Sequence, residues 1–393
     1  MPTAVLDVDL LRLPAELLVP PLYRSAVILI RLDGLPLGKA ILPVRDGRVL
    51  APDLAATLIE ACGMRYWRAR VSRAVGVSHH TLPPGKRTCS IAICTRERPE
   101  DLRNCLAAVT SLPDDGQEIL VIDNAPRTDA TQKVVEGFPG VRYFREDRPG
   151  LDVARNRALR EARHEVVAFT DDDAMVDRDW LRTLSRNFDD PLVLCVTGLT
   201  LAAELETPAQ EVFEQQNPFG RGFTRRVFEA TTHNPLQSGP MGAGVNMAVR
   251  REAVLTRLHG FDDALDAGTP TQSGGDHDLF TRVLTAGFRI VYDPGALVWH
   301  RHRREWRELA RTIQGYGTGV YAAWTKSLLV DRELTVARIA WGWFRHDQLP
   351  GLVRSVLRQR NRRSFRLALR ELWGCALGPW AYLLSARRAR ARR

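Results

Sequence analysis

The chain has 393 residues, 45% of them apolar, and a formal net charge of +10, which suits one large globular domain or two to three smaller ones. Its six cysteines show no zinc-ligand spacing, so we expect reduced thiols in a reducing compartment. The N-terminus lacks a signal-peptide pattern and no apolar stretch approaches the roughly 20 residues that span a bilayer, which predicts a cytoplasmic protein.

Residues 1–84 are predicted to form a small α+β unit of their own. Short strands are expected at 26–30 and 39–44, and a helix at 52–64, followed by a Pro- and Gly-containing linker at 82–86. Nothing in this unit points to chemistry. We therefore expect a structural or docking role for it.

From Cys89 onward, predicted strands alternate with predicted helices. Strands are expected at 89–94, 118–122, 141–145 and 166–169, with helices at 99–112, 128–136 and 151–162 between them. This order predicts an α/β fold with a mostly parallel, doubly wound sheet. Ligands bind beyond the carboxyl ends of strands in such sheets, where Thr95, Asp123 and Asp171 all fall.

Three consecutive carboxylates, Asp171, Asp172 and Asp173, follow the apolar run at 166–169. Because like charges repel, a cation is expected to neutralise them, and carboxylate oxygens suit Mg²⁺ or Mn²⁺. A phosphate-bearing ligand is the usual reason to hold such an ion. The alternative is a helix N-terminus, where aspartate is favoured by the helix dipole. We favour the cation and ligand.

The C-terminal region, residues 304–393, is predicted to be helical and basic. The stripe of apolar residues along 305–324 favours a helix that faces the core over one that lines an acceptor site. Segments 334–344, 354–370 and 372–384 follow, and residues 351–393 hold 12 Arg and a single acid, Glu371. Aromatic residues with dense arginine favour a helix lying on an anionic membrane surface. A solvated, partly disordered tail and a nucleic-acid patch are the alternatives, and we expect no nucleic acid.

Four motifs in order give residues 89–299 a resemblance to a known family. They are Ile91-Ala-Ile-Cys-Thr-Arg-Glu-Arg-Pro99, Ile119-Leu-Val-Ile-Asp-Asn-Ala125, Pro149-Gly-Leu-Asp-Val-Ala-Arg-Asn-Arg157 with Phe169-Thr-Asp-Asp-Asp-Ala174, and Gly274-Gly-Asp-His-Asp-Leu279 with Val298-Trp-His300 behind it. Together they resemble the inverting nucleotide-sugar glycosyltransferases of the GT-A fold, the family 2 type. The resemblance implies a GT-A domain at 85–303, between the two other units.

The resemblance also implies which residues bind the donor. Asp123 would accept a hydrogen bond from a uracil-type N–H, although an Asx turn is the alternative for this residue. Arg155, at a helix N-terminus, would hold phosphate, the alternative being a surface salt bridge with Asp152. The residues expected to bind the nucleotide sugar are Thr95, Arg96, Arg98, Asp123, Asp152, Arg155, Asn156, Asp171, Asp172 and Asn246.

For the metal, the resemblance implies Asp171, Asp173 and His300 as ligands of Mg²⁺ or Mn²⁺. Asp276 would be the catalytic base that takes the proton of the acceptor hydroxyl, with Asp278 as the competing candidate and helix capping as the structural alternative. Many relatives carry Glu where this chain has Gly275. Gly275, Asp278 and Trp299 are possible acceptor-side or secondary residues.

The sequence therefore predicts a metal-dependent inverting glycosyltransferase at the cytoplasmic face of a membrane. The donor would be a UDP-, GDP- or TDP-sugar, and the acceptor a hydroxyl of a glycan, a lipid-linked sugar or a small molecule, as in polysaccharide biosynthesis. A sugar nucleotidyltransferase is the alternative enzyme, but residues 95–99 lack its expected Gly-rich phosphate loop. A non-catalytic membrane- or nucleic-acid-binding protein on a transferase scaffold is the other alternative.

Overall fold

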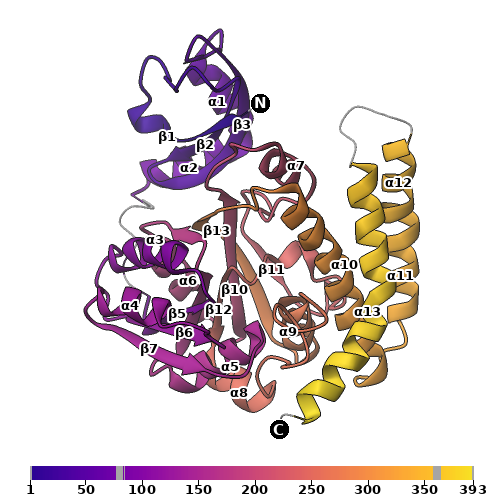
Figure 1. Cartoon of the computed structure of the whole chain (residues 1–393). Helices are drawn as coiled ribbons and strands as arrows, with labels where there is room; N and C mark the ends of the chain where they lie inside the picture. Colours follow the sequence, from indigo (N-terminus) through magenta and orange to yellow (C-terminus); the bar gives the residue numbers. More distant parts are fainter. Residues whose placement is uncertain (1, 77–82, 84, 357–363, 392–393) are drawn as a thin grey trace.

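The computed structural model describes residues 2–76, 83, 85–356 and 364–391. A small N-terminal sheet stands on one end of a larger sheet, and the C-terminal helices run along the side of the larger unit (Figure 1). No helix in these described ranges combines the length and the apolar character needed to cross a membrane.

The N-terminal unit is built on a four-stranded sheet in the order β1-β2-β3-β4. Its core is apolar, with Ile28, Ile30 and Leu58 fully buried. The predicted strands and helix are present, but α1 ends at Gly63, whose φ of 57° favours glycine, and a second helix follows. The elements are β1 Thr3–Asp9, β2 Ser25–Leu32, β3 Leu35–Arg45, β4 Arg48–Val49, α1 Leu54–Cys62 and α2 Met64–Ala74.

Charged and apolar contacts join this unit to the larger one. Arg31 on β2 donates to Asp177 of the larger unit at 2.7 Å, and Lys39 on β3 pairs with Glu214 at 2.8 Å. Leu29 packs in a small apolar cluster with Leu199 from the larger sheet. The division at residue 84 stays a prediction, although each sheet has its own core.

The larger sheet has the order β11-β13-β10-β12-β8-β5-β6-β7, and β9 pairs with β13 off this path. Strands β8, β5, β6 and β7 are parallel as predicted, whereas β12 runs antiparallel between β8 and β10. The predicted α/β class with a large sheet flanked by helices is confirmed. The strands are β5 Cys89–Thr95, β6 Glu118–Asn124, β7 Val141–Glu146, β8 Val166–Asp171, β9 Ala174–Val176, β10 Val193–Ala202, β11 Arg226–Phe228, β12 Asn246–Arg250 and β13 Arg289–His300.

Helices cover both faces of this sheet because its strands are apolar on both sides. Along β5, Ile91 and Ile93 enter one core, while Ala92 and Cys94 enter the core on the opposite face. The covering helices are α3 Pro99–Thr110, α4 Ala130–Glu136, α5 Leu151–Glu161, α6 Trp180–Arg186, α8 Arg251–Arg257 and α9 Gly275–Thr285.

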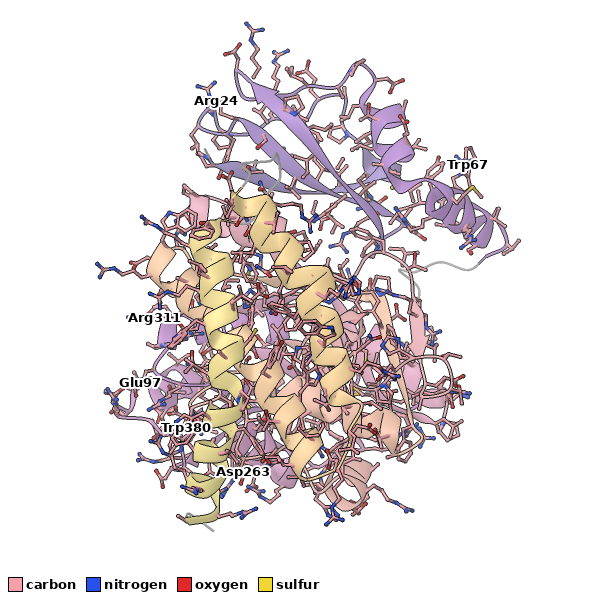
Figure 2. All side chains as sticks on the ribbon, turned by 90° about the vertical axis from the view of Figure 1, so that its right-hand side faces the viewer. Arg24, Trp67, Glu97, Asp263, Arg311 and Trp380 are labelled. Carbon is pink, nitrogen blue, oxygen red and sulfur yellow. The ribbon has the colours of Figure 1, made fainter. Side chains whose placement is uncertain are left out.

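The C-terminal helices pack as a layer on the larger unit (Figures 1 and 2). Glycines allow α13 to lie close against α10, since a Cβ added at Gly374 would stand 3.0 Å from the backbone nitrogen of Thr318. The prediction of separate segments at 354–370 and 372–384 is wrong, because one helix continues from Phe365 to Ala391. Residues 357–363 lie outside the described ranges. The helices are α7 Pro208–Gln216, α10 Trp306–Leu329, α11 Val336–Trp343, a π-helical turn Phe344–Gln348, α12 Leu349–Val356 and α13 Phe365–Ala391.

Candidate active site

The three aspartates occupy a tight turn between two strands. β8 ends at Asp171 and β9 begins at Ala174, so Asp172 and Asp173 form the connection. No helix follows them directly, which rules out helix capping as the reason for the acidic run. The register of the sheet places Thr95 beside Asp123 and Cys94 beside Asp171. The predicted meeting of these strand ends at one edge is therefore present.

Basic side chains surround Asp173, which is buried. It pairs with His300 at 3.2 Å, Arg98 at 3.0 Å and Arg303 at 3.3 Å. Burial alone would raise the pKa of Asp173, but His300 and the two arginines outweigh it and hold this pKa well below its usual range. Asp173 is therefore a carboxylate at neutral pH, the form in which it can bind a cation.

Asp172 is turned into the protein, toward β5. It accepts a hydrogen bond from the hydroxyl of Thr95 at 2.6 Å and pairs with Arg98 at 3.1 Å. Burial and the nearby charge of Asp173 raise the pKa of Asp172 to about 6. Thr95, Asp172 and Arg98 thus link β5 to the acidic turn.

Asp171, Asp173 and His300 form a potential metal-binding cluster. One ligand atom from each of them lies within 4.8 Å of the others. His300 ends β13, and Asp171 ends β8, so two strands of the larger sheet fix the positions of these side chains. Two carboxylates and an imidazole at this spacing fit a divalent cation.

Asp123 is fully buried at the end of β6. One of its oxygens accepts a hydrogen bond from the hydroxyl of Tyr143 at 2.9 Å, whereas Oδ1 has no hydrogen-bond partner among the described residues. Burial raises the pKa of Asp123. The following loop is held instead by Asn124, which donates to the carbonyl of Arg148 and accepts from the amide of Gly150. An unpaired buried carboxylate oxygen is costly, so Asp123 is poised for a ligand donor.

Arg155 lies at the centre of a buried charge cluster on α5. Its guanidinium pairs with Asp152 at 3.0 Å and with Asp266 at 2.8 Å, and all three side chains are buried. The alternative of a surface salt bridge does not hold, because this pair is buried. Oδ2 of Asp152 has no hydrogen-bond partner among the described residues, and burial raises the pKa of Asp152 well above its usual value.

Asp276 lies in the first turn of α9 and lines a cavity of about 420 Å³. Asp171, Arg155 and Asp266 line the same cavity, which we call the Asp276 cavity. The carboxylate accepts hydrogen bonds from the backbone amides of Gly244 at 3.0 Å and His277 at 2.8 Å. Burial raises its pKa, but His277, Arg155 and these amides outweigh that effect and hold the pKa of Asp276 below its usual value. Asp276 is therefore ionised at neutral pH.

Comparison with known proteins identifies the family of the segment that carries the acidic turn. Residues 90–257 match the family described as Glycosyl transferase family 2. This part of the chain belongs to glycosyltransferase family 2. The predicted family is therefore confirmed, and the matched segment of the glycosyltransferase domain includes the acidic turn, Asp123 and Arg155.

Relatives with curated descriptions support this assignment. The chain is 29% identical over 257 residues to a "Pre-mycofactocin glycosyltransferase" of Mycobacterium tuberculosis (strain CDC 1551 / Oshkosh). This match covers 63% of this chain and 50% of the relative. It is 24% identical over 216 residues to an "N-acetylglucosaminyltransferase" of Rhizobium sp. (strain N33), covering 52% of this chain and 46% of the relative. The chain thus spans about half the length of these curated relatives.

A solved structure shares the fold of the glycosyltransferase domain. It is a mannosyltransferase from Pyrobaculum calidifontis in complex with GDP-Man and Mn²⁺. The match has a TM-score of 0.52 and 18% sequence identity, and it covers 81% of this chain and 94% of that chain. At this identity the likeness shows the GT-A fold.

Several residues expected to serve the glycosyltransferase site have other contacts. The amide of Asn156 donates to the carbonyl of Phe261, and neither residue lines the Asp276 cavity. Asn246 is fully buried within the sheet, where its amide donates to the carbonyls of Leu199 and Ala296 and its oxygen accepts from the indole of Trp180. Direct donor contacts from Asn156 and Asn246 do not fit these positions.

The residues predicted as possible acceptor-side or secondary residues, and Arg96, have different surroundings. Asp278 is buried and pairs with Lys326 at 2.6 Å and Arg282 at 2.7 Å, so it holds α9 against α10. Trp299 packs with Leu29 and its neighbours beside the N-terminal unit, away from the Asp276 cavity. Gly275 lies directly against the carboxylate of Asp152. Arg96 is exposed after β5, at the same edge as Asp123.

The sequence analysis did not identify Arg303 and Asp266, which partner Asp173 and Arg155 in the larger unit. The run His300-Arg-His-Arg-Arg304 after β13 was a signal for Arg303, since a basic run beyond a strand end can reach a neighbouring acidic turn. Asp266 lies in an irregular segment ahead of α9 and carried no comparable signal.

Proposed function

We propose that this protein is an inverting glycosyltransferase that moves a sugar from a nucleotide-diphosphate donor to an acceptor hydroxyl. The observation that carries the proposal is that Asp171, from the acidic turn, and Asp276, an ionised carboxylate on α9, line one cavity. A cation-binding group and a proton acceptor are the two functions that such a transfer needs on either side of the sugar. The family and its relatives support transferase chemistry.

The nucleotide would lie across the ends of β5 and β6. Oδ1 of Asp123 would accept a hydrogen bond from an N–H of the base, which would satisfy its unpaired position. Thr95 and Arg98 would hold the acidic turn in place through Asp172. A mannosyltransferase of the same fold, bound to GDP-Man and Mn²⁺, supports a GDP-sugar among the expected donors.

Asp171, Asp173 and His300 would hold a divalent cation, and a bound cation would neutralise negative charge on the departing diphosphate. Mg²⁺ takes oxygen ligands and keeps several waters, whereas this cluster includes an imidazole nitrogen. We therefore expect Mn²⁺ to bind more tightly than Mg²⁺. The arginines beside Asp173 would add positive charge on the same side of the diphosphate.

In the transfer step, an acceptor oxygen forms a bond to the anomeric carbon of the donor sugar from the face opposite the diphosphate. The bond between that carbon and the diphosphate oxygen breaks, and the leaving group keeps the electron pair. The acceptor proton passes to a carboxylate oxygen of Asp276. Backbone amides of Gly244 and His277 orient this carboxylate and keep it ionised before the step.

Replacing Asp276 with Asn tests the proposal, because it removes the proton acceptor with little change of shape. Transfer should fall about 10²- to 10⁴-fold, the usual contribution of a general base. The affinity for nucleoside diphosphate with Mn²⁺ should change little. The donor is found first by screening nucleotide sugars for cation-dependent hydrolysis. A D276N variant with full transfer activity would refute the assignment of the base.

The sugar nucleotidyltransferase alternative finds less support. Thr95 ends β5 and Arg98 follows it, and their side chains bind Asp172 where a Gly-rich loop would be expected to wrap a triphosphate. The buried, paired state of Asp173 and the ordered Asp276 also argue against a non-catalytic scaffold. A cation-dependent transfer of nucleotide to a sugar phosphate would favour the alternative.

We also propose that α13 docks the enzyme on the cytoplasmic face of an anionic membrane, where polysaccharide precursors would be available. Phe365, Leu369, Trp373, Trp380 and Leu383 are exposed along it, and Trp380 points outward in Figure 2. This spacing forms one apolar stripe, and exposed Arg387 and Arg388 lie at its end. Tyr382 faces inward and packs beside Leu265, so the opposite face of the helix is buried.

Vesicle binding tests the docking proposal. The double variant W373E/W380E should lose sedimentation with vesicles of phosphatidylserine and phosphatidylcholine, because charged groups enter the interface poorly. W341E, which alters an exposed tryptophan on α11, is the matched control. Equal binding of the double variant and the wild type would contradict the proposal.

A further inference from the structure

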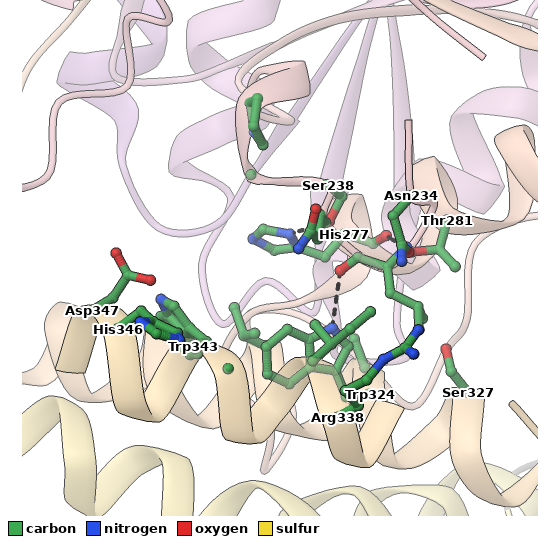
Figure 3. A pocket seen from close by; sticks show the side chains of 18 residues that line it. Asn234, Ser238, His277, Thr281, Trp324, Ser327, Arg338, Trp343, His346 and Asp347 are labelled. Carbon is green, nitrogen blue, oxygen red and sulfur yellow. Dashed lines mark hydrogen bonds between the residues drawn. The ribbon is translucent and has the colours of Figure 1, made fainter. Parts of the chain in front are cut away.

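A second cavity, of about 610 Å³, adjoins the Asp276 cavity. It lies between the loop at 234–241, the helices α9 and α10, and the face of α11 with the turn after it (Figure 3). We call it the Trp324 cavity. Its volume falls in the range of small-molecule sites. Most of its walls come from residues beyond the segment that matches the family, so the family assignment does not account for it.

The two cavities share part of their lining. His277, Val320 and Trp343 line both of them. His277 directly follows Asp276 on α9, and its Nδ1 lies 2.6 Å from the hydroxyl of Ser238, which fixes the ring at the boundary. Figure 3 shows this pair across the cavity from Trp324 and Trp343. A molecule in the Trp324 cavity can therefore extend toward the carboxylate of Asp276.

The apolar wall of the Trp324 cavity is aromatic. The ring planes of Trp324 and Trp343 meet at 88° with centroids 5.6 Å apart, so the two indoles form a corner. Tyr321, which is not part of the cavity lining, packs against both rings. The indole N–H of Trp324 donates to the carbonyl of Leu236 at 3.1 Å, which holds that ring in place. A flat ring placed in such a corner can stack on one indole and meet the other edge-on. A flexible alkyl chain gains no comparable orientation.

Polar groups lie at the other parts of the lining. Arg338 and Asp347 are exposed charged residues at the edge, and Asn234 and the Ser238–His277 pair lie on the loop side. An apolar corner combined with a polar rim fits an amphipathic molecule that carries both a flat ring and hydroxyl groups.

We propose that the Trp324 cavity is the acceptor subsite, and that it takes an acceptor in which a flat ring system is joined to a group that carries the hydroxyl, such as an aryl glycoside. The ring would occupy the indole corner, and the hydroxyl would point past His277 to Asp276. This proposal rests on the proposed function, since it names the acceptor class of the same site. It assigns acceptor recognition to the C-terminal helices.

Gly342 on α11 offers a way to fill the cavity without disturbing its walls. It lines the cavity, and a Cβ added there would meet no atom within 4 Å. A Gly342→Leu side chain would enter the open space and would also favour the helix. Gly351 on α12 is the matched control, because it is also helical with open space around it but lies outside the lining.

Binding of three glucosides tests the proposal by saturation-transfer difference NMR, which needs no turnover. The probes are 4-methylumbelliferyl, octyl and methyl β-D-glucopyranoside, which share the sugar and differ in the attached group. We expect the umbelliferyl compound to bind best, with the strongest saturation on its ring protons. G342L should weaken that binding about tenfold, the scale of one lost ring contact, and G351L should keep it.

Either of two results would overturn the proposal. One is an unchanged umbelliferyl affinity in G342L, and the other is octyl or methyl glucoside binding as tightly as the umbelliferyl compound. The readout is independent of transfer, so its failure is distinguishable from a failure of the proposed function. Loss of transfer in D276N with intact ring binding would support both proposals, whereas intact transfer in D276N would refute only the base.

Discussion

Gly275 is the position where one added carbon should damage the site most clearly. It begins α9 directly before Asp276, and a Cβ built on it would lie 2.6 Å from both Oδ1 and Cγ of Asp152, closer still to Oδ2. Real Cβ atoms essentially never come within 3.0 Å of a neighbour. Asp152 has no room to withdraw, because it is fully buried and Arg155 holds its Oδ1. The start of α9 must move in a G275A variant.

Relieving this overlap needs a displacement on the order of 1 Å, which Asp276 would follow. A misplacement of that size can lower the rate about 100-fold. Overpacking of this kind also lowers the free energy of unfolding by about 1–3 kcal/mol. The measurements are kcat with the donor found by screening, and thermal unfolding of the same preparation. We expect both to fall.

A control variant and a double-mutant cycle test whether the overlap with Asp152 causes these losses. Gly351→Ala adds a Cβ in open space within a helix and should leave kcat unchanged. In a background that already carries Asp152→Ala, G275A should cost much less stability, because the opposing oxygens are gone. Wild-type kcat and unfolding temperature in G275A, or the same cost in both backgrounds, would refute the overlap as the cause.

Three further changes separate the roles of individual carboxylates. Asp173→Asn should weaken Mn²⁺ binding at least about tenfold in titration calorimetry, because it removes a charged ligand atom, and unchanged affinity would argue against the cluster. Asp123→Asn should weaken nucleoside diphosphate binding about tenfold, because an amide replaces the carboxylate oxygen that would accept from the base N–H. Tyr143→Phe removes a hydrogen bond to the other oxygen of Asp123 and should weaken this binding less. Asp278→Asn should lower the free energy of unfolding in urea by about 3 kcal/mol through loss of a buried ion pair. It should lower kcat far less than D276N does. A larger loss of kcat in D278N than in D276N would make Asp278 the base.

The sheet and its acidic edge could be predicted because both follow from local patterns. Each strand of the first half is a short apolar run with a turn after it, and Thr95, Asp123 and Asp171 directly follow such runs or end them. Parallel strands bring their carboxyl ends to one edge, which places these residues together without knowledge of the loops. The antiparallel β12 was not predicted, because Gly239, Gly242 and Gly244 just before it do not favour a strand.

Neighbouring residues explain the predictions that did not fit. Along β13, successive side chains point to opposite faces, so His300 reaches the acidic turn while Trp299 packs toward the N-terminal unit. On α9, residues two apart face different sides of the helix, so only one of Asp276 and Asp278 can face the cavity. The periodicity of the strand or helix therefore allows one residue of each pair to face the site, but not both. It does not say which one. The choice depends on tertiary contacts, such as the ion pair with Lys326, that local sequence does not specify.

The charge balance of the acidic turn should couple the binding of the cation to the binding of the nucleoside diphosphate. Arg98 and Arg303 offset part of the charge of Asp172 and Asp173, so a cation alone gains less from this turn than it would from unpaired carboxylates. A nucleoside diphosphate adds negative charge beside the same arginines and supplies further oxygen ligands. Each ligand should therefore raise the affinity for the other by the same factor. Titration of Mn²⁺ with and without nucleoside diphosphate measures this coupling. Equal Mn²⁺ affinity in the two titrations would refute it.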